Sequence, residues 1–505
     1  MCFQSTKYSS DEIIKLIKSR KERYWLKVRE NRSLIIFKWA AKNIPAYKSF
    51  LKKHNIDYLK IKNFNDFLSV PAVSKNNYLK QYDIEKISCG CFLNKPTVFT
   101  ATSGSTGALF YFPRREQLDW QYSVISELFF RNGFLKEVEP TLVIVGFGMG
   151  VWIGGLITYK AFEIAGENGY PLSIITPGVN KQEIFNAFKN LSPHFKRTIL
   201  TGYPPFIKDI IDESSLNGID LKKLNLRLLF AAEMFTEKFR DYLAGKAGIK
   251  NIYLDTLNIY GSADMGAMAF ETPVSILIRR LALKNKKLFR EIFKDINKTP
   301  TLAQYIPSFI NFETKDGEIL LTGDSVMPLI RYSIGDRGGV LTFGEVKEKF
   351  KKHNIDLTKE AFRAGIEKHI YELPFVYVYE RADFAVKLRL RDIYPEFIKD
   401  ALMHKTIRRY LTGKFVMETK YNRQQNQYLE VNLEMKKDKN VNAVLRKKIY
   451  KEIENSLYSK SSGPGGVSEF KKGGPLLKLF FWRAGYEKYF KPGIKQKWAV
   501  KEVKN

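Results

Sequence analysis

The stretch Thr102-Ser103-Gly104-Ser105-Thr106-Gly107 combines hydroxylated side chains with glycines in one short run. Glycine lets a backbone approach a ligand closely and adopt a positive φ, while hydroxyls and exposed N–H groups donate hydrogen bonds to anionic oxygens. The run is therefore typical of a loop that wraps phosphate oxygens. Taken alone it also fits an ordinary polar loop, so its interpretation depends on the motifs that follow it.

Length and composition indicate a folded, cytoplasmic protein. The chain has 505 residues, 44% of them apolar, enough for about two to four domains with sizeable cores. The close pair Cys89 and Cys91, with Cys2 far away, lacks the spacing of a four-ligand zinc site. Few cysteines are typical of a reducing compartment. Residues 1–7 contain no apolar core of a secretion signal.

Residues 141–159 carry no charge and could be mistaken for a membrane span. Glycine is unfavourable inside an isolated helix, so a glycine-rich span is a poor candidate. The pattern instead predicts a buried strand over 141–145, then a glycine loop and the start of a helix. The glycines are Gly146, Gly148, Gly150, Gly154 and Gly155.

The net charge of +31 comes mostly from lysine and is spread along the chain. A strongly basic chain suits an anionic partner, but no recognisable nucleic-acid module accompanies it, so no nucleic-acid partner is expected. The densest basic stretch covers residues 279–298. It is interpreted either as a solvated helix face or as a surface that attracts anionic substrates or lipid headgroups, which includes peripheral membrane contact. The oligomeric state has no signal in the sequence.

Short apolar runs alternate with helical stretches over residues 97–270. This alternation predicts an α/β core with largely parallel strands, in which ligands bind in loops at the carboxyl ends of the strands. Ahead of it, Ser9 and Glu12 have the spacing of a capping box and predict a helix start. Predicted strands cover 141–145, 172–176, 198–201, 226–231 and 251–254, and predicted helices cover 181–191 and 236–247.

The chain after about residue 384 has a different pattern. Apolar and polar residues alternate over 429–435, as in a half-buried strand, and 414–420 is a second strand candidate. Helices are predicted over 395–410 and 441–457. The stretch predicts a small α+β domain, interrupted by a flexible Ser-Gly-Pro-rich break at 461–466.

Several further motifs follow the small-residue run in a fixed order. Each one sits after a predicted strand or in a loop, where a ligand would be bound. Together they are far more specific than any one of them. They are AAE (231–233), NIYGSAD (258–264), GEILL (317–321), PLIRYSIGD (328–336), ERADFAVK (380–387) and DIYP (392–395).

This ordered series resembles the adenylate-forming superfamily, which comprises acyl-CoA synthetases, peptide-synthetase adenylation domains and luciferases. The phenylacetate–CoA ligase-like branch looks closest, since IPAY (44–47) and LSVPAVSK (68–75) resemble its N-terminal segments. The resemblance covers most of residues 35–400. It implies a large N-terminal α/β domain over 1–380, which binds nucleotide and acid, and a mobile C-terminal α+β lid over 381–505, joined by a hinge.

The resemblance also implies roles for individual residues. Residues Thr102 to Gly107 would hold the β- and γ-phosphates of ATP. Tyr260 and Gly261 would contact adenine, Glu233 would lie near it, and Asp336 would bind the ribose hydroxyls. Asp264 would bind Mg²⁺, a hard cation that prefers carboxylate oxygen. The competing pair Gly323-Asp324 lacks the Arg331-Tyr332 lead-in that favours Gly335-Asp336. The remaining nucleotide-binding and hinge residues are Ser262, Arg381 and Asp383.

The sequence departs from the family pattern at several positions. The metal carboxylate is usually glutamate, and Asp264 is one methylene shorter. Ala263 stands where a threonine or serine hydroxyl usually contacts the α-phosphate, with Ser262 as the neighbouring candidate. Leu390 replaces the glycine on which thiol access depends, and Ala108-Leu109-Phe110 follows the small-residue run in place of Pro-Lys. These departures bear more on the second half-reaction than on ATP binding.

A catalytic lysine near the C-terminus is expected by analogy, where it would neutralise charge during adenylation. Lys495 and Lys497 are the candidates, with Arg381 as a supporting cation; a lysine in this basic tail also fits simple solvation. The acid-binding pocket is expected to use aromatic and apolar side chains, which suit an aryl or fatty carboxylate but fit the protein core equally well. Its candidates are Phe147, Met149, Trp152 and Tyr203.

The reaction implied is ATP-dependent activation of a carboxylic acid through an acyl-adenylate, followed by transfer to CoA. The enzyme class is then an AMP-forming acid–thiol ligase that uses ATP, Mg²⁺ and CoA. Two alternatives stay open. One is acyl or adenylyl transfer to another acceptor such as an amine, which Leu390 favours. The other is a non-catalytic relative that binds nucleotide or an anion, which Ala263 and the basic charge favour.

Overall fold

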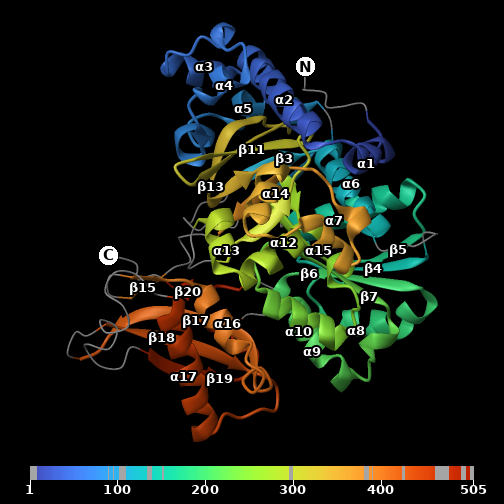
Figure 1. Ribbon diagram of the computed structural model, residues 1–505, viewed down its shortest axis with the longest axis vertical. Coiled ribbons are helices and arrows are strands. Elements are labelled where there is room, and N and C mark those ends of the chain that lie inside the picture. Colours follow the sequence, from blue (N-terminus) through green and yellow to red (C-terminus); the bar gives the residue numbers. More distant parts are fainter. Residues whose placement is uncertain are drawn as a thin grey trace.

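The computed structural model describes residues 8–88, 90–94, 96–101, 110–132, 139–150, 153–294, 299–379, 386–388, 391–423, 427–460, 477–490 and 496–500. Figure 1 shows a large N-terminal part and, beside it, a smaller C-terminal lobe in orange and red. The phosphate-loop residues 102–107, the hinge residues 380–385, Trp152, Leu390 and Lys495 lie outside the described residues.

Helices α2 to α5 cover the β11–β13 end of the large sheet, and α1 packs beside α6 (Figure 1). The predicted capping box is confirmed, because the Ser9 N–H donates to Glu12 Oε2 at 2.7 Å and the Glu12 N–H donates to Ser9 Oγ at 3.3 Å. The helices are α1 (Ser10–Ser19), α2 (Glu22–Asn43), α3 (Pro45–Lys53), α4 (Phe64–Leu68) and α5 (Ile84–Ser88), with short turns η1 (Tyr58–Lys60), η2 (Lys75–Leu79) and η3 (Cys91–Leu93).

One large sheet runs through the N-terminal part in the order β11-β12-β13-β14-β10-β9-β8-β7-β6-β4-β5, with β1 added alongside β13. A separate hairpin, β2 with β3, flanks the phosphate-loop residues. The strands are β1 (Val73–Ser74), β2 (Val98–Ala101), β3 (Tyr111–Arg114), β4 (Thr141–Gly146), β5 (Leu172–Ile175), β6 (Arg197–Gly202), β7 (Leu226–Ala231), β8 (Thr256–Ser262), β9 (Gly266–Phe270), β10 (Thr301–Gln304), β11 (Ile310–Lys315), β12 (Glu318–Gly323), β13 (Leu329–Leu341) and β14 (Phe375–Val378).

The predicted parallel α/β core is confirmed for β5, β4, β6, β7 and β8. Helices pack on both faces of this part, which explains why strands such as β4 and β7 are largely apolar. From β8 to β11 the successive strand pairs of the sheet are antiparallel, because tight hairpins such as β8–β9 reverse the chain and a parallel pair needs a long crossover. The added strand β1 is parallel to β13.

The elements of the N-terminal part lie near their predicted boundaries, except for one predicted strand. Residues 251–254 are not a strand: they form most of a short helix, and β8 starts at Thr256. The Asn251 side chain accepts from the N–H groups of Tyr253 and Leu254, at 3.0 and 3.2 Å, and so caps a helix start. The helices and turns are α6 (Glu116–Asn132), α7 (Ile153–Glu167), α8 (Lys181–Asn190), η4 (Ser192–His194), α9 (Pro204–Glu213), η5 (Ser215–Asn217), η6 (Leu221–Lys223), α10 (Glu237–Ala247), α11 (Ile252–Asp255), α12 (Pro273–Lys284), α13 (Lys286–Phe293), α14 (Phe343–Lys352), α15 (Leu357–Arg363) and η7 (Glu367–His369).

The C-terminal lobe has the predicted α+β composition and its own apolar core. A sheet of order β19-β18-β17-β20 packs against two helices. The first helix ends at Leu402 rather than near residue 410, since the chain then turns and places Ile407 in that core. The elements are β15 (Val386–Leu388), β16 (Arg391–Ile393), α16 (Pro395–Leu402), β17 (Leu411–Tyr421), β18 (Gln427–Met435), α17 (Ala443–Lys460), β19 (Leu477–Trp482) and β20 (Ala499–Val500).

The lobe docks on helix α9 through buried charges. Lys414 pairs with Asp209, and Lys436 Nζ lies 2.6 Å from Asp212 Oδ2. Burial alone would raise the pKa of Asp212, but the Lys208 and Lys436 ammoniums outweigh it and lower that pKa. The docked orientation therefore depends on ion pairs that are largely removed from water.

Within the described residues, no helix is both long and apolar enough to cross a membrane. In the uncharged stretch 141–159, residues 141–146 form strand β4 and residues 153–159 form the first half of α7. Its strand is buried along its full length in the parallel part of the sheet.

Candidate functional site

The site lies where strands β7 and β8 end, as the parallel-sheet pattern predicts. These strands are neighbours, with Ala231 paired to Ile259. Directly after β7, Ala232 adopts a φ of 71°, which is uncommon for a residue with a side chain. Glu233 follows it and is 9% exposed. The backbone therefore turns sharply over residues 232–236, and the Glu233 carbonyl accepts from Asn258 Nδ2 of β8 at 3.5 Å.

Tyr260 and Asp336, predicted for adenine and ribose, come together from strands β8 and β13. The Tyr260 hydroxyl donates to Asp336 Oδ2 at 2.6 Å, and the Tyr260 ring packs against Phe312 with centroids 6.1 Å apart. The rival carboxylate Asp324 instead accepts from Arg32 Nη2 at 2.8 Å, in a buried ion pair. Of the two Gly-Asp pairs, only the second places its carboxylate at Tyr260.

Gly261 and Ser262 continue β8 beside the returning strand β9. A Cβ at Gly261 would lie 2.6 Å from the Gly266 carbonyl oxygen, so the two strands can approach only because this residue has no side chain. The Ser262 hydroxyl lies 3.7 Å from the Met268 sulfur. Ser262 thus faces β9 in this conformation, and its predicted contact with the nucleotide stays a prediction.

Asp264 lies in the turn between β8 and β9 and is almost fully buried. The Tyr332 hydroxyl donates to Asp264 Oδ2 at 2.6 Å, and Lys75 Nζ lies 3.6 Å from the same oxygen. Protein sites for Mg²⁺ use one or two carboxylates together with phosphates and waters. The residues around Asp264 fit such an ion poorly, because an ammonium already faces the carboxylate. Within the described residues, no group of three or more Asp, Glu, His or Cys side chains could hold a metal ion. Magnesium ligation by Asp264 stays a prediction.

The residues just before the predicted phosphate loop contact the turn that carries Asp264. Strand β2 ends at Ala101, directly before Thr102 in the sequence, and pairs with β3. Thr100 Oγ1 donates to the Ala263 carbonyl at 3.3 Å. The residues that precede the loop are therefore tied to the turn that carries Asp264.

The C-terminal tail reaches the same region from the other lobe. Trp498 Nε1 donates to Glu233 Oε2 at 3.0 Å, and the indole is 4% exposed. Its ring packs on Phe415, at 4.9 Å between centroids, and the Lys399 ammonium lies 4.2 Å from its centroid. Sequence reasoning missed Trp498, whose only signal is its position beside Lys497. Trp498 thus contacts the turn that carries Glu233, and its neighbour Lys497 is exposed.

The described residues predicted for the acid pocket differ in burial. Phe147 is fully buried in the core cluster around β4 and meets the Tyr203 ring edge-on at 5.2 Å. Met149 is partly buried. Burial raises the pKa of Tyr203, with a further contribution from the Glu233 charge. Tyr203 thus connects this aromatic pair to the Glu233 turn.

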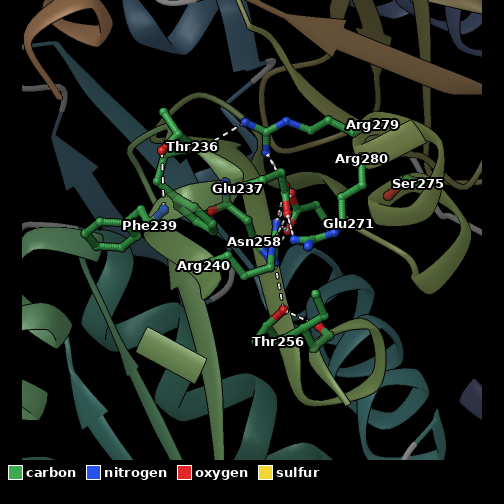
Figure 2. A network of polar contacts seen from close by, with 12 residues as sticks. Thr236, Glu237, Phe239, Arg240, Thr256, Asn258, Glu271, Ser275, Arg279 and Arg280 are labelled. Atoms are coloured by element: carbon green, nitrogen blue, oxygen red, sulfur yellow. Dashed lines mark hydrogen bonds and ion pairs between the residues drawn. The ribbon is translucent and has the colours of Figure 1, made fainter. Parts of the chain in front are cut away.

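A buried network of ion pairs contacts the turn over residues 232–236. Figure 2 shows Arg240, Arg279 and Arg280 converging on Glu237 and Glu271. Arg240 Nη2 lies 2.7 Å from Glu271 Oε1. Arg279 Nη1 lies 3.1 Å from Glu237 Oε1, and its Nη2 donates to the Phe235 carbonyl at 2.6 Å. The network therefore holds the backbone of the turn as well as helices α10 and α12.

This network changes the interpretation of the basic stretch 279–298. Its first residue, Arg279, is 1% exposed and is neither on a solvated face nor available to an anionic surface. Burial alone would raise the pKa of Glu237, but Arg240 and Arg279 outweigh it and lower that pKa to about 2. Burial keeps the pKa of Glu271 raised despite Arg240. Charge density in the sequence could not reveal these partners, because they come from α10 and from the end of β9.

The chain has the fold of the adenylate-forming enzymes. No protein-family model and no curated protein sequence matches the chain. It is similar to the crystal structure of a 2-hydroxyisobutyryl-CoA ligase in the postadenylation state, with 13% identity and a TM-score of 0.66 over 99% of this chain and 94% of that chain. The same ligase with 2-HIB-AMP and CoA, in the thioesterification state, gives 13% identity and a TM-score of 0.51 over 99% and 94%. Likeness at this identity shows the fold, and the phenylacetate–CoA ligase-like branch stays a prediction.

Proposed function

We propose that this protein activates a carboxylic acid with ATP and transfers the acyl group to CoA. In the first step a carboxylate oxygen of the acid bonds to the α-phosphorus, and the bond from that phosphorus to the bridging oxygen breaks. Pyrophosphate leaves, and an acyl-adenylate remains. In the second step the CoA sulfur bonds to the acyl carbon, AMP leaves, and the thiol proton is released. The acid is proposed to be an aryl or fatty carboxylate.

One observation carries this proposal: the contact of Tyr260 with Asp336 beside the Glu233 turn, at the ends of β7 and β8. A carboxylate held by a tyrosine hydroxyl can also accept hydrogen bonds from two vicinal hydroxyls of a ribose. The tyrosine ring beside it offers a flat apolar surface to a purine. Catalysis would then depend on positioning and on neutralising phosphate charge, with Lys495 or Lys497 and Arg381 as the proposed cations.

The test measures pyrophosphate release with MgATP across a panel of aryl and fatty acids. Asp336→Ala removes the acceptor for the ribose hydroxyls, and the expected loss in kcat/KM for ATP is at least about 100-fold, since two charged hydrogen bonds are lost. Asp324→Ala is the matched control, because it removes the carboxylate of the rival Gly-Asp pair. Thermal unfolding of both variants checks that they fold.

Acid-dependent release that is lost in Asp336→Ala and retained in Asp324→Ala supports adenylation and identifies the acid class. The reverse pattern assigns the ribose role to Asp324. Wild-type protein that binds MgATP but releases no pyrophosphate with any acid contradicts the proposal and favours the non-catalytic relative.

A second acceptor is also proposed, because Leu390 stands where the resemblance expects the glycine for thiol access. A branched side chain at that position would narrow a path for the pantetheine arm, and an amine could then take the acyl group. AMP formation that depends on CoA distinguishes the two acceptors: the CoA reaction requires it, whereas transfer to an amine proceeds without it.

A further inference from the structure

The ammonium of Lys75 is held at the turn that carries Asp264. Strand β1 pairs in parallel with β13, with Val73 opposite the buried Tyr332 and Ser74 opposite Ser333, and Lys75 comes directly after this pairing. Ser74 and Asn77 cap the turn that Lys75 begins, with the Ser74 N–H donating to Asn77 Oδ1 at 2.6 Å. The backbone of Lys75 is therefore fixed on both sides, and its charge has a defined place.

Lys75 has the burial expected of a cation that serves both a carboxylate and a ligand. Its side chain is 34% exposed, whereas the Asp264 side chain is 2% exposed and lies 3.6 Å away. A buried carboxylate is stable only beside a counter-charge, and Lys75 supplies one. An ammonium has three N–H donors, and a single carboxylate oxygen engages at most one of them. At least two donors are left for another acceptor on the exposed side.

The anion expected at this turn is the polyphosphate of ATP, so the inference rests on the proposed function. Lys75 Nζ lies 5.8 Å from the ring centroid of Phe112, on the strand that pairs with β2. Strand β2 leads directly into residues 102–107, and Thr100 on it bonds to Ala263. An Asp264 carboxylate without a cation would repel phosphate oxygens; at about 4 Å two unit charges interact by about 4 kcal/mol near a protein surface.

We propose that Lys75 is a phosphate-binding residue of this protein, anchored by Asp264 and Tyr332, and that it takes the position that a protein-held metal ion would otherwise occupy. Asp264 then serves as a positioning residue for Lys75. Magnesium enters with ATP on its phosphates and needs no carboxylate from the protein. The departure from glutamate to the shorter Asp264 follows, since the side chain has to reach an ammonium that is already in place.

The test is calorimetric titration of the full-length protein with MgATP, without any acid. Lys75→Met removes the charge and keeps a similar length, and Lys75→Arg keeps the charge. Lys80→Met is the matched control: it makes the same change at an exposed lysine just after the same turn. Lys75→Met is expected to weaken MgATP binding about 10- to 100-fold, the factor for one charged hydrogen bond. Lys75→Arg and Lys80→Met are expected to stay within about threefold.

The variant Asp264→Asn distinguishes two roles of Asp264: holding Lys75 in place, or binding Mg²⁺. If Asp264 positions Lys75, the double variant Asp264→Asn with Lys75→Met binds MgATP no more weakly than Lys75→Met alone, because the two changes remove one interaction. The free Mg²⁺ needed for half-maximal binding is then the same in Asp264→Asn as in wild type.

Equal MgATP affinity in Lys75→Met and Lys80→Met overturns the inference. A tenfold higher Mg²⁺ requirement in Asp264→Asn, with additive effects in the double variant, also overturns it and identifies Asp264 as the metal ligand. Pyrophosphate release is measured separately: if wild type binds MgATP but activates no acid, the proposed function fails while the binding comparison still decides the role of Lys75. Wild type that binds no MgATP overturns both.

Discussion

Replacing Arg279 by methionine removes one guanidinium from the network beneath the Glu233 turn and keeps most of the side-chain volume. The lost contacts are those to Glu237 Oε1 at 3.1 Å, to Glu271 Oε1 at 3.5 Å and to the Phe235 carbonyl at 2.6 Å. Arg240 still pairs with both carboxylates. The variant therefore leaves two buried acids with fewer cations, and one carbonyl without its guanidinium donor.

Removing one partner of a buried ion pair costs about 3–5 kcal/mol, because the remaining charge stays out of water. Since Arg240 remains, we expect the lower end, about 3 kcal/mol. The control is Arg280→Met. Arg280 is 21% exposed on its side chain and also pairs with the half-exposed Asp241 at 2.9 Å, and such solvent-accessible pairs contribute about 0–1 kcal/mol.

The destabilisation caused by Arg279→Met is expected to decrease as the pH is lowered. Burial already raises the pKa of Glu271, and losing Arg279 raises it further. A carboxyl whose pKa is higher in the folded protein than in the unfolded chain stabilises the fold below the unfolded value and loses that contribution as pH rises through the folded value. The destabilisation by Arg279→Met is therefore smaller at pH 5 than at pH 7.

Hydrogen exchange measured by mass spectrometry suits a chain with two lobes, where a single unfolding free energy is poorly defined. Amides of α10 in Arg279→Met are expected to exchange about 100-fold faster at pH 7 than in wild type, since each 1.4 kcal/mol is tenfold. Amides of α17, in the other lobe, serve as an internal reference. Equal exchange of α10 in Arg279→Met and Arg280→Met, or an effect that does not shrink at pH 5 after correction for intrinsic rates, refutes this reasoning.

Trp498→Phe keeps the packing on Phe415 but removes the donor to Glu233. We expect about a tenfold loss of kcat for pyrophosphate release, the effect of about 1.4 kcal/mol, with unchanged thermal unfolding; a wild-type rate would show that the tail and the turn are not coupled. Burial, aided by the Lys18 charge, lowers the pKa of His369 from 6.5 to about 4. A base with a lowered pKa binds protons more readily in the unfolded chain, so stability falls as pH drops from 6.5 to 4, by up to about 3 kcal/mol. Urea unfolding at pH 7 and pH 5 should show a smaller pH effect in His369→Gln, and an equal effect would exclude His369 as the cause.

The sequence alone predicted the elements whose formation depends on local patterns. Strands β4 and β7 are largely apolar because helices cover both faces, and such runs are visible without a structure. The motif order was also sufficient to predict the class of fold. The prediction was wrong at 251–254, where apolar residues predicted a strand. The Asn251 side chain instead caps a short helix.

The contacts that would make a site were decided by the tertiary structure. In the sequence, Arg279 is one more cation in a basic stretch. Only the packing of α12 against α10 and the end of β9 brings it to the carboxylates of Glu237 and Glu271. Lys75 reaches Asp264 because β1 pairs with β13, and Trp498 reaches Glu233 because the lobe docks on α9. One sequence does not show which residues hundreds of positions apart will be in contact. The free energy of an ion pair or hydrogen bond depends on a distance between atoms, and only the folded chain sets that distance.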